Sequence, residues 1–278
     1  MYFLMKKIIA IIAAAVLPFT SLTSARAQDK LEASVGADFV SRYIWRGLDL
    51  GGVSFQPTLG LGWKGLSLSA WGSVGIANPA DTKEFDLTLS YTIGGFNIGV
   101  TDYWFDAGLD PLNRYFMYRS DCTNHVFEAN IGYDFGFAAI QWYTNFAGND
   151  GVNPAGKRAF SSYLELSAPF TLGGADWSAA VGVVPFATEF YGTEKFALVN
   201  LSLTASKEIA ITDSFSIPVF AQLAANPYAK QFYFVLGITL PICSPSPAPA
   251  GLRAIPRRRS PGARSPRRSG AAGGRGRD

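Results

Sequence analysis

The chain has 278 residues, of which 48% are apolar, 14% are aromatic and only 16% are charged, with two cysteines and one histidine. This composition excludes an intrinsically disordered chain and a disulfide-stabilised scaffold, and the length suffices for one large domain or two small ones. The net charge of the whole chain is +3, but its segments differ in charge. Residues 28–240 hold 12 basic and 20 acidic side chains, which gives this segment a net charge of −8. The basic net charge of the chain therefore gives no indication of nucleic-acid binding.

The first 27 residues have the pattern of a secretory signal peptide. Lys6 and Lys7 precede an apolar run over residues 8–17, and small residues stand at Ala25 and Ala27. An anchoring helix fits less well, because the apolar run is shorter than the roughly 20 residues that span a bilayer. We therefore expect residues 1–27 to direct the chain out of the cytoplasm.

From residue 31 to residue 240 the apolar side chains recur with a period of two, which is typical of β-strands with one apolar and one polar face. In the segment 84–93, apolar residues from Phe85 to Ile93 alternate without exception with polar residues from Glu84 to Thr92. Twelve such segments are expected, each close to the ~9–11 residues with which a tilted strand crosses a bilayer. They are residues 31–46, 53–63, 66–75, 84–93, 96–105, 125–134, 137–146, 160–170, 177–186, 196–206, 214–223 and 230–240.

Two kinds of connection alternate between these segments. Short turns lie at Lys64-Gly65, Gly94-Gly95, Phe135-Gly136, 172–176 and 207–213, and longer polar loops follow the other segments. This alternation is typical of outer-membrane barrels, whose short turns are periplasmic. In lipid every strand edge must be paired, and only closure removes both edges. The sequence therefore predicts an all-β fold, a transmembrane antiparallel up-and-down β-barrel of about 12 strands over residues 28–240.

A soluble β-sandwich or a lipocalin-like barrel is the alternative fold. The number of strands and the small Ser, Thr and Gly residues on the polar face disfavour it. Aromatic residues at the strand ends also favour a membrane barrel, because they suit its two interfacial girdles. These aromatic residues are Tyr43, Trp45, Trp63, Tyr91, Tyr103, Trp104, Tyr133, Trp142 and Trp177.

The start of the predicted barrel has a distinctive pattern. Residues 35–47 read VGADFVSRYIWRG, with Gln56 on the next segment and Trp71-Gly72-Ser73 on the third. Over roughly residues 33–75 the chain resembles the TorF-type family of bacterial outer-membrane porins, although the loop after Gly47 departs from the family pattern. The resemblance implies a channel in the outer membrane of a Gram-negative cell, and it implies no residue-level mechanism.

Residues 241–278 differ in composition from the barrel. Residues 244–278 consist almost wholly of Pro, Ser, Ala, Gly and Arg, which cannot bury a core, so we expect a disordered Arg/Pro-rich tail over 241–278. The alternation that ends at Leu240 is of the kind that the barrel-assembly machinery reads at a C-terminus. The tail is therefore interpreted as an altered reading frame or artefactual 3′ end, with a genuine basic periplasmic tail as the alternative.

The period of two also assigns charged side chains to the inner face of the barrel. These lumen residues are Glu32, Asp38, Glu84, Asp86, Glu128, Asp134 and Glu165, together with Arg42 and Arg46. Acidic groups around a narrow aqueous path raise the local cation concentration. With Asp38, Arg42 and Arg46 on one face of the first strand, either a constriction or a structural salt-bridge ladder is expected. A loop that folds into the lumen could plug the channel, and we expect the long loop 106–124 to be that loop.

Catalytic chemistry has little support in the sequence. The single histidine, His125, is expected at the outer rim facing lipid, where some outer-membrane lipid hydrolases place a Ser/His pair. A serine partner is missing, and Thr144 is the nearest hydroxyl on the following strand. We expect no catalytic residue, no metal site and no cofactor, with His125 bonded to a loop or a lipid headgroup.

The sequence thus predicts an outer-membrane, porin-like channel for passive diffusion of small polar or cationic solutes. Its expected partners are outer-membrane lipid, the barrel-assembly machinery and the solutes, with no nucleic acid. Two alternatives stay open, a closed structural or adhesive barrel with partner-binding loops, and an outer-membrane lipid-modifying enzyme built around His125.

Overall fold

The computed structural model describes residues 31–78, 80–106, 114–119, 122–212 and 215–243. The signal peptide predicted for residues 1–27 lies outside the described residues, as does the predicted tail from residue 244 onward. The described residues contain no helix of the length and hydropathy that would cross a membrane.

Fourteen strands form within these ranges. They are β1 (Glu32–Val40), β2 (Tyr43–Trp45), β3 (Leu48–Gly51), β4 (Ser54–Trp63), β5 (Leu66–Gly75), β6 (Lys83–Ile93), β7 (Phe96–Asp106), β8 (His125–Asp134), β9 (Ala139–Gly148), β10 (Ser162–Leu172), β11 (Ala175–Val184), β12 (Ala197–Thr212), β13 (Phe215–Asn226) and β14 (Gln231–Cys243).

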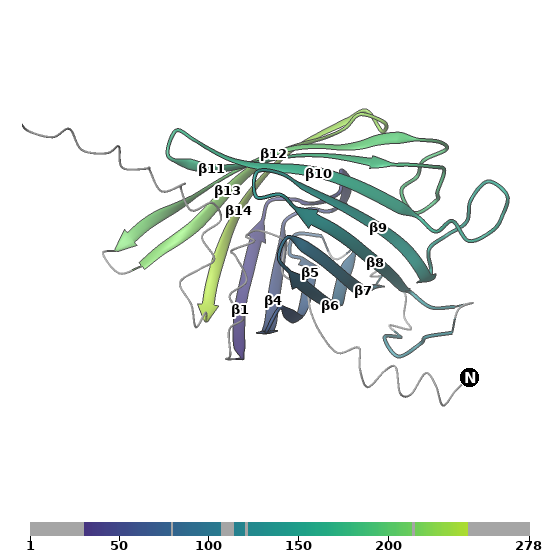
Figure 1. Cartoon of the computed structure of the whole chain (residues 1–278), viewed down its shortest axis with the longest axis horizontal. Coiled ribbons are helices and arrows are strands. Elements are labelled where there is room, and N and C mark those ends of the chain that lie inside the picture. Colours follow the sequence, from purple (N-terminus) through teal and green to yellow (C-terminus); the bar gives the residue numbers. More distant parts are fainter. Residues whose placement is uncertain (1–30, 79, 107–113, 120–121, 213–214, 244–278) are drawn as a thin grey trace, which may run out of the picture.

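Twelve of these strands close into one antiparallel barrel (Figure 1). Each strand pairs with its neighbour along the chain, and β1 completes the ring by pairing with both β4 and β14. At the closing seam Ala37 lies opposite Leu240 and Val40 opposite Gly237. β14 continues to Cys243, three residues past the predicted end of the barrel domain. The predicted all-β fold, a closed antiparallel barrel of about 12 strands, is confirmed.

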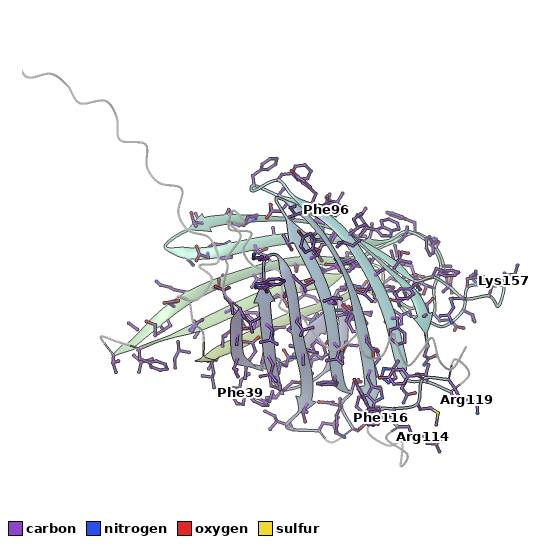
Figure 2. All side chains as sticks on the ribbon, turned by 60° about the horizontal axis from the view of Figure 1, so that its bottom comes forward. Phe39, Phe96, Arg114, Phe116, Arg119 and Lys157 are labelled. Atoms are coloured by element: carbon purple, nitrogen blue, oxygen red, sulfur yellow. The ribbon has the colours of Figure 1, made fainter. Side chains whose placement is uncertain are left out.

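The period-two pattern separates the two faces of the barrel wall. On β6 the side chains of Glu84, Asp86 and Thr88 are buried on the inner face, while Tyr91 and Ile93 are exposed on the outer face. Outward aromatic side chains such as Phe39 and Phe96 point away from the ribbon (Figure 2). An apolar surface this extensive is what lipid covers in a membrane barrel.

The first predicted strand, 31–46, is wrong in length. β1 ends at Val40, and β2 and β3 form a separate two-stranded hairpin, which pairs Trp45 with Leu48. The chain reverses at Arg46 and Gly47, whose φ angles are 49° and 78°. Two consecutive residues with positive φ make the tight turn that matches the twist of a hairpin. A continuous strand through residue 46 is therefore impossible.

A second difference concerns the predicted turn at 207–213. The ladder between β12 and β13 continues past Lys207, which lies opposite Val219, to Thr212, which lies opposite Phe215. β12 therefore reaches Thr212 and is the longest strand of the described barrel, with 16 residues. The expected turn is mostly strand because the cross-strand pairing continues.

The two faces of the wall predict opposite responses to a charge at the same depth. Leu59, 55% exposed in the middle of β4, faces outward, and the preceding Thr58 faces the lumen. We expect Leu59→Arg to lower the free energy of unfolding by ~2–4 kcal/mol, because it places a charge in hydrocarbon. Thr58→Arg should cost clearly less. Urea titration of the barrel in lipid vesicles measures both, and equal losses would contradict the assignment of the faces.

Candidate functional site

The β2–β3 hairpin lies inside the barrel and reaches opposite walls. On one side the Tyr43 hydroxyl donates a hydrogen bond of 2.9 Å to Glu84 Oε2 on β6. On the other side the Asn226 side-chain amide of β13 donates to the Gly47 carbonyl at 3.2 Å. A Cβ atom on Gly47 would lie 1.9 Å from the Val199 carbonyl oxygen of β12, so the hairpin tip is in close contact with that strand. The hairpin therefore occupies the lumen at the long-loop end of the barrel.

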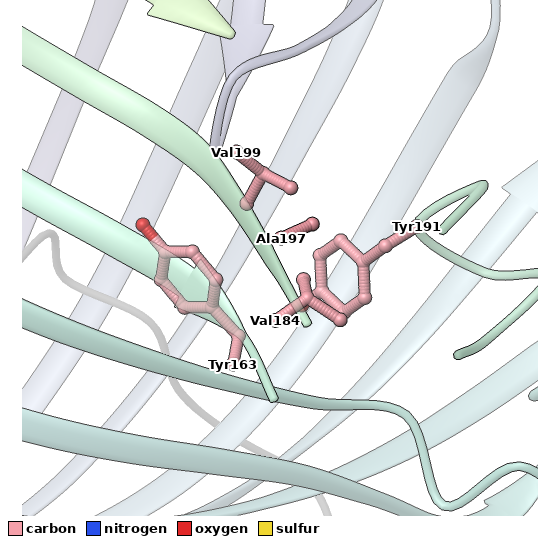
Figure 3. Packing of buried hydrophobic residues seen from close by; sticks show 5 residues of the cluster. All are labelled: Tyr163, Val184, Tyr191, Ala197 and Val199. Atoms are coloured by element: carbon pink, nitrogen blue, oxygen red, sulfur yellow. The ribbon is translucent and has the colours of Figure 1, made fainter. Parts of the chain in front are cut away.

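The tip of the hairpin packs against an apolar cluster on the inner wall. This buried cluster consists of Tyr163, Val184, Tyr191, Ala197 and Val199 (Figure 3). Trp45 and Leu48 of the hairpin pack against it, and the Trp45 ring stacks on Tyr191 with centroids 6.0 Å apart and an interplanar angle of 9°. Such an aromatic pair contributes about 0.5–1.5 kcal/mol beyond its area burial. Apolar contact therefore holds the hairpin in the lumen.

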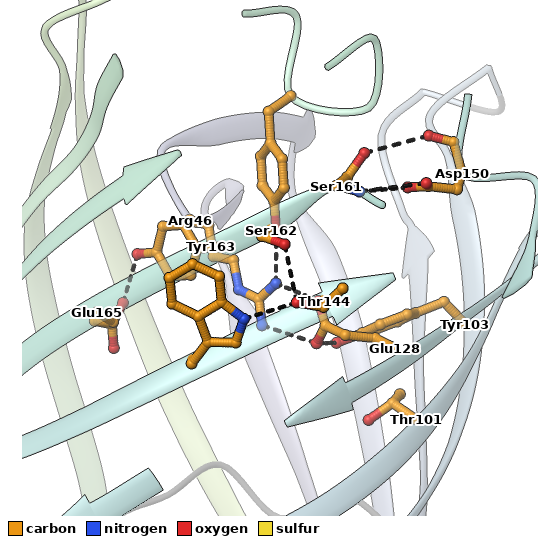
Figure 4. A network of polar contacts seen from close by, with 12 residues as sticks. Arg46, Thr101, Tyr103, Glu128, Thr144, Asp150, Ser161, Ser162, Tyr163 and Glu165 are labelled. Carbon is orange, nitrogen blue, oxygen red and sulfur yellow. Dashed lines mark hydrogen bonds and ion pairs between the residues drawn. The ribbon is translucent and has the colours of Figure 1, made fainter. Parts of the chain in front are cut away.

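Arg46 forms the central polar contact of the site (Figure 4). Its Nη1 donates to Glu128 Oε2 at 2.6 Å and its Nη2 to Oε1 at 3.0 Å, so the guanidinium binds the carboxylate with two parallel bonds. The side chains of Arg46 and Glu128 are only 8% and 2% exposed. Nη1 also donates to the Tyr191 hydroxyl at 2.7 Å, and the Tyr103 hydroxyl donates to Glu128 Oε1 at 2.9 Å. Burial raises the pKa of Tyr191, which keeps this hydroxyl neutral.

Aromatic rings surround the same guanidinium. Its Cζ atom lies 3.8 Å from the centre of the Tyr143 ring, 4.4 Å from that of Trp45 and 4.7 Å from that of Tyr163. Cation–π attraction strengthens when the cation is removed from water, as it is here. The Tyr163 ring is itself fixed, because its hydroxyl donates to Glu165 at 2.6 Å and accepts from Asn200 at 3.1 Å.

Glu84 and Asp86 form an acidic pair on β6, next to the hairpin. Both carboxyl groups are buried, at 5% and 4% exposure, and neither forms an ion pair with an arginine or lysine among the described residues. Glu84 accepts the Tyr43 hydroxyl, whereas Oδ1 of Asp86 has no hydrogen-bond partner. In the described ranges no three His, Cys, Asp or Glu side chains are grouped as metal ligands would be. The pair thus places two adjacent carboxyl groups on the inner face without a basic partner among the described residues.

The other charged residues predicted for the lumen are placed as follows. Asp38 lies on β1, and its Oδ1 is buried without a hydrogen-bond partner. Glu165 lies on β10, and Asp134 lies at the short-turn end of β8, where it accepts the Gly136 amide at 2.5 Å. Glu32 lies at the start of β1, and every one of these side chains has the inward parity of its strand.

Arg42 and Arg46 do not share a strand with Asp38, and this predicted spacing is wrong. β1 ends before both arginines, so Arg42 lies at the base of the hairpin and Arg46 at its tip. Arg42 is 45% exposed and pairs with Asp49 across the hairpin. The single ladder or constriction along one strand is replaced by two separate ion pairs, one exposed and one buried.

A shallow, open pocket lies beside the base of the hairpin. It has a volume of about 450 Å³ and is lined by Arg42, Asp49 and residues 50–52 of the hairpin, with Asn78 and Asp81 among the residues of the loop between β5 and β6. Asp81 fastens that loop to the hairpin, because its Oδ2 accepts the Gly52 amide at 3.0 Å. The pocket lies at the long-loop end, where β6 begins and carries Glu84.

His125 lies at the long-loop end of β8 and has no exposed surface. Its Nδ1 is 2.7 Å from Asp102 Oδ1, and its Nε2 is 2.5 Å from the Tyr115 carbonyl oxygen. Both ring nitrogens are therefore engaged by the wall and a loop. Thr144 is instead hydrogen-bonded to Ser162 at 2.9 Å and to Trp142 at 2.7 Å. Among the described residues no hydroxyl group is hydrogen-bonded to the His125 ring, and the Thr123 hydroxyl accepts only the backbone amide of His125, at 3.0 Å.

The long loop predicted to fold inward packs outside the barrel in its described part. Tyr115 contacts the outward rings of Trp104 and Phe85, with centroids 5.4 and 5.7 Å apart, and Tyr118 stacks on His125 at 4.2 Å. For residues 114–119 the expectation of a plug is therefore wrong. The aromatic residues of this loop bury themselves against the outer rim, and the β2–β3 hairpin takes the place in the lumen.

The fold and the site together define a closed 12-stranded β-barrel with a hairpin folded into its lumen. No family model matches the sequence, and no curated protein matches it. A crystal structure of the COG4313 outer membrane channel from Pseudomonas putida F1 aligns with 81% of this chain and 97% of that chain, at a TM-score of 0.36 and 11% identity. A likeness this distant assigns neither family nor solute. The resemblance of residues 33–75 to the TorF-type family stays a prediction.

The two arginines of the hairpin should differ in their effect on stability. Arg46→Ala leaves the buried Glu128 carboxylate without its cation, so we expect a loss of ~3–5 kcal/mol in the free energy of unfolding. Arg42→Ala removes an exposed pair and should cost ~0–1 kcal/mol. Denaturant titration of both variants measures the difference. Similar losses for the two would show that Arg46 is not buried with Glu128.

Gly47 provides a second test of the hairpin position. Its φ of 78° and its approach to Val199 leave no room for a Cβ atom, so Gly47→Ala should lift the tip from β12. Gly156→Ala is the matched control, because Gly156 also has a positive φ, 69°, yet a Cβ atom there meets nothing within 4 Å. A cysteine at position 48, in a background without native cysteines, should react roughly tenfold faster with a soluble maleimide if seating weakens by ~1.4 kcal/mol. Unchanged reactivity in Gly47→Ala would refute the close contact.

Proposed function

We propose that this barrel is an outer-membrane channel for passive diffusion of small polar solutes, with a preference for cations, and that the β2–β3 hairpin limits its permeability. The observation that carries the proposal is the acidic pair of Glu84 and Asp86 on the inner face, which has no basic partner among the described residues. The outer-membrane location is supported by the closed ladder and the apolar outer face.

The balance of charge inside the barrel favours cations. Arg46 is neutralised by Glu128 and Arg42 by Asp49. The remaining inward carboxyl groups have no ion pair among the described residues, namely those of Glu32, Asp38, Glu84, Asp86, Asp134 and Glu165. Fixed negative charge beside a narrow aqueous path concentrates cations and repels anions.

The hairpin sets how far the channel is open. Its strands form a sheet of their own and are not part of the barrel ladder, so moving them breaks no hydrogen bond between barrel strands. With the hairpin seated, its tip packs on β12 while its base contacts β6, which narrows the lumen. We expect a small conductance in this state and a larger one when the hairpin leaves.

A closed barrel is the second candidate, favoured by the same hairpin, because the tip buries an apolar cluster inside the lumen. In that case the loops would carry the function by binding a partner. Lipid modification at His125 has no comparable support, since both ring nitrogens are already engaged.

Conductance in a planar bilayer tests the proposal. Under a KCl gradient the reversal potential should have the sign of cation selectivity, because the unpaired carboxylates face the path. Glu84→Gln should weaken that selectivity and Glu84→Gln/Asp86→Asn should weaken it further. Glu194→Gln removes the same charge from an exposed loop position and should leave selectivity unchanged.

A variant with residues 43–51 replaced by a short Gly/Ser linker separates a gated channel from a closed barrel. The hairpin deletion should raise conductance severalfold while the barrel stays folded. If the folded deletion variant gives no conductance at any voltage, the channel is refuted and the closed barrel stands.

A further inference from the structure

We propose that the inner wall carries a binding site for solutes with a guanidinium group, and that Arg46 of the hairpin occupies this site as a built-in competing ligand. The site consists of Glu128, Tyr103, Tyr143 and Tyr163 on the barrel strands, with Tyr191 from the loop after β11. This inference rests on the proposed channel, because it names a class of solute and a means of closing the same lumen.

The wall part of the site is complete without the hairpin. Glu128 keeps the hydrogen bond from Tyr103, and Tyr163 keeps its bonds to Glu165 and Asn200. Tyr103, Glu128, Tyr143 and Tyr163 lie on β7, β8, β9 and β10, and the supporting Asn200 lies on β12, all of them strands of the closed ladder. A carboxylate and aromatic rings held in this way are preorganised, so a ligand need not order them.

The geometry selects guanidinium over ammonium. Two nitrogens of Arg46 donate to the two oxygens of Glu128, at 2.6 and 3.0 Å, and the same flat group lies 3.8 Å from the centre of the Tyr143 ring. A planar, delocalised cation can make the two-point contact and the ring contact together. An ammonium group is a compact, strongly hydrated charge and cannot form the fork.

Arg46 can move out of the wall site together with the hairpin, and the position of Arg46 in the hairpin turn bears on the function of its side chain. Arg46 is in the turn of a hairpin that does not pair with the barrel strands. Its φ of 49° lies in the left-handed region, where Asn, Asp or Gly is the favoured residue of such a turn. Lys64 has the same φ of 49° at the corresponding position of another turn, so the backbone accepts a long basic residue, and the distinguishing feature of Arg46 is the buried contact of its guanidinium with Glu128.

Chemical rescue tests the site with methylguanidinium chloride as the probe and methylammonium chloride as the control ion. In folded Arg46→Ala barrel, methylguanidinium should raise the melting temperature at ~tenfold lower concentration than methylammonium, as expected for the loss of one charge-assisted bond. Wild type should show no selective shift, since Arg46 fills the site. Arg46→Ala/Glu128→Gln should also show none, because the carboxylate is gone. Arg46→Gly is a second vacant-site variant, and it suits the turn.

Conductance gives an independent readout. Methylguanidinium should reduce the conductance of Arg46→Ala and leave that of Arg46→Ala/Glu128→Gln unchanged. A selective thermal shift without conductance in any variant would support the site and refute the channel. If the barrel conducts but methylguanidinium and methylammonium have the same effect on both the melting temperature and the conductance, the proposed site is refuted. The Arg46–Glu128 pair would then be purely structural. Failure of both readouts would refute both proposals.

Discussion

The backbone N–H and C=O groups at a sheet edge need partners, and closure of the sheet on itself, which gives both edges partners, shapes the whole molecule. It forces β1 to pair with β14 as well as with β4. Because side chains alternate along each strand, closure sends half of them into one enclosed space. That space must be filled or hydrated. Here it is filled at the long-loop end by a hairpin with its own apolar contacts, its own turn and a buried ion pair.

Most of the barrel could be predicted from the sequence, because alternation and turn chemistry are local. The segments 66–75 and 125–134 agree with β5 and β8 to the residue, and the inward parity of Glu84 and Asp86 follows from the same pattern. This pattern could not distinguish the β2–β3 hairpin from a continuation of the first strand, since the apolar residues keep a period of two on both sides of the turn. The available signal was Arg46-Gly47, which has the same turn chemistry as Lys64-Gly65, with φ angles of 49° and 78° against 49° and 86°.

The site itself depends on contacts that no local pattern reveals. Arg46 meets Glu128 across 82 residues of chain and Tyr191 across 145. Tyr43, Trp45 and Tyr103, predicted for the interfacial girdles, instead lie inside the lumen. For Tyr103 the parity with the inward Asn97 and Thr101 was a usable signal. For Tyr43 and Trp45 the alternation gave no such signal, because the direction of their side chains depends on where the chain turns.

The balance of forces on the hairpin explains how a plug can be both specific and reversible. A buried ion pair contributes little net stability, since the removal of two charges from water offsets much of their attraction, although leaving either partner alone is costly. The Arg46–Glu128 pair therefore fixes where the hairpin sits more than how tightly it is held. Tightness comes from the burial of Trp45 and Leu48 against the Tyr163 cluster, an area-dependent contact. When the hairpin leaves, water or another cation must reach Glu128 at the same moment, so opening of the lumen and occupation of the wall site are linked steps.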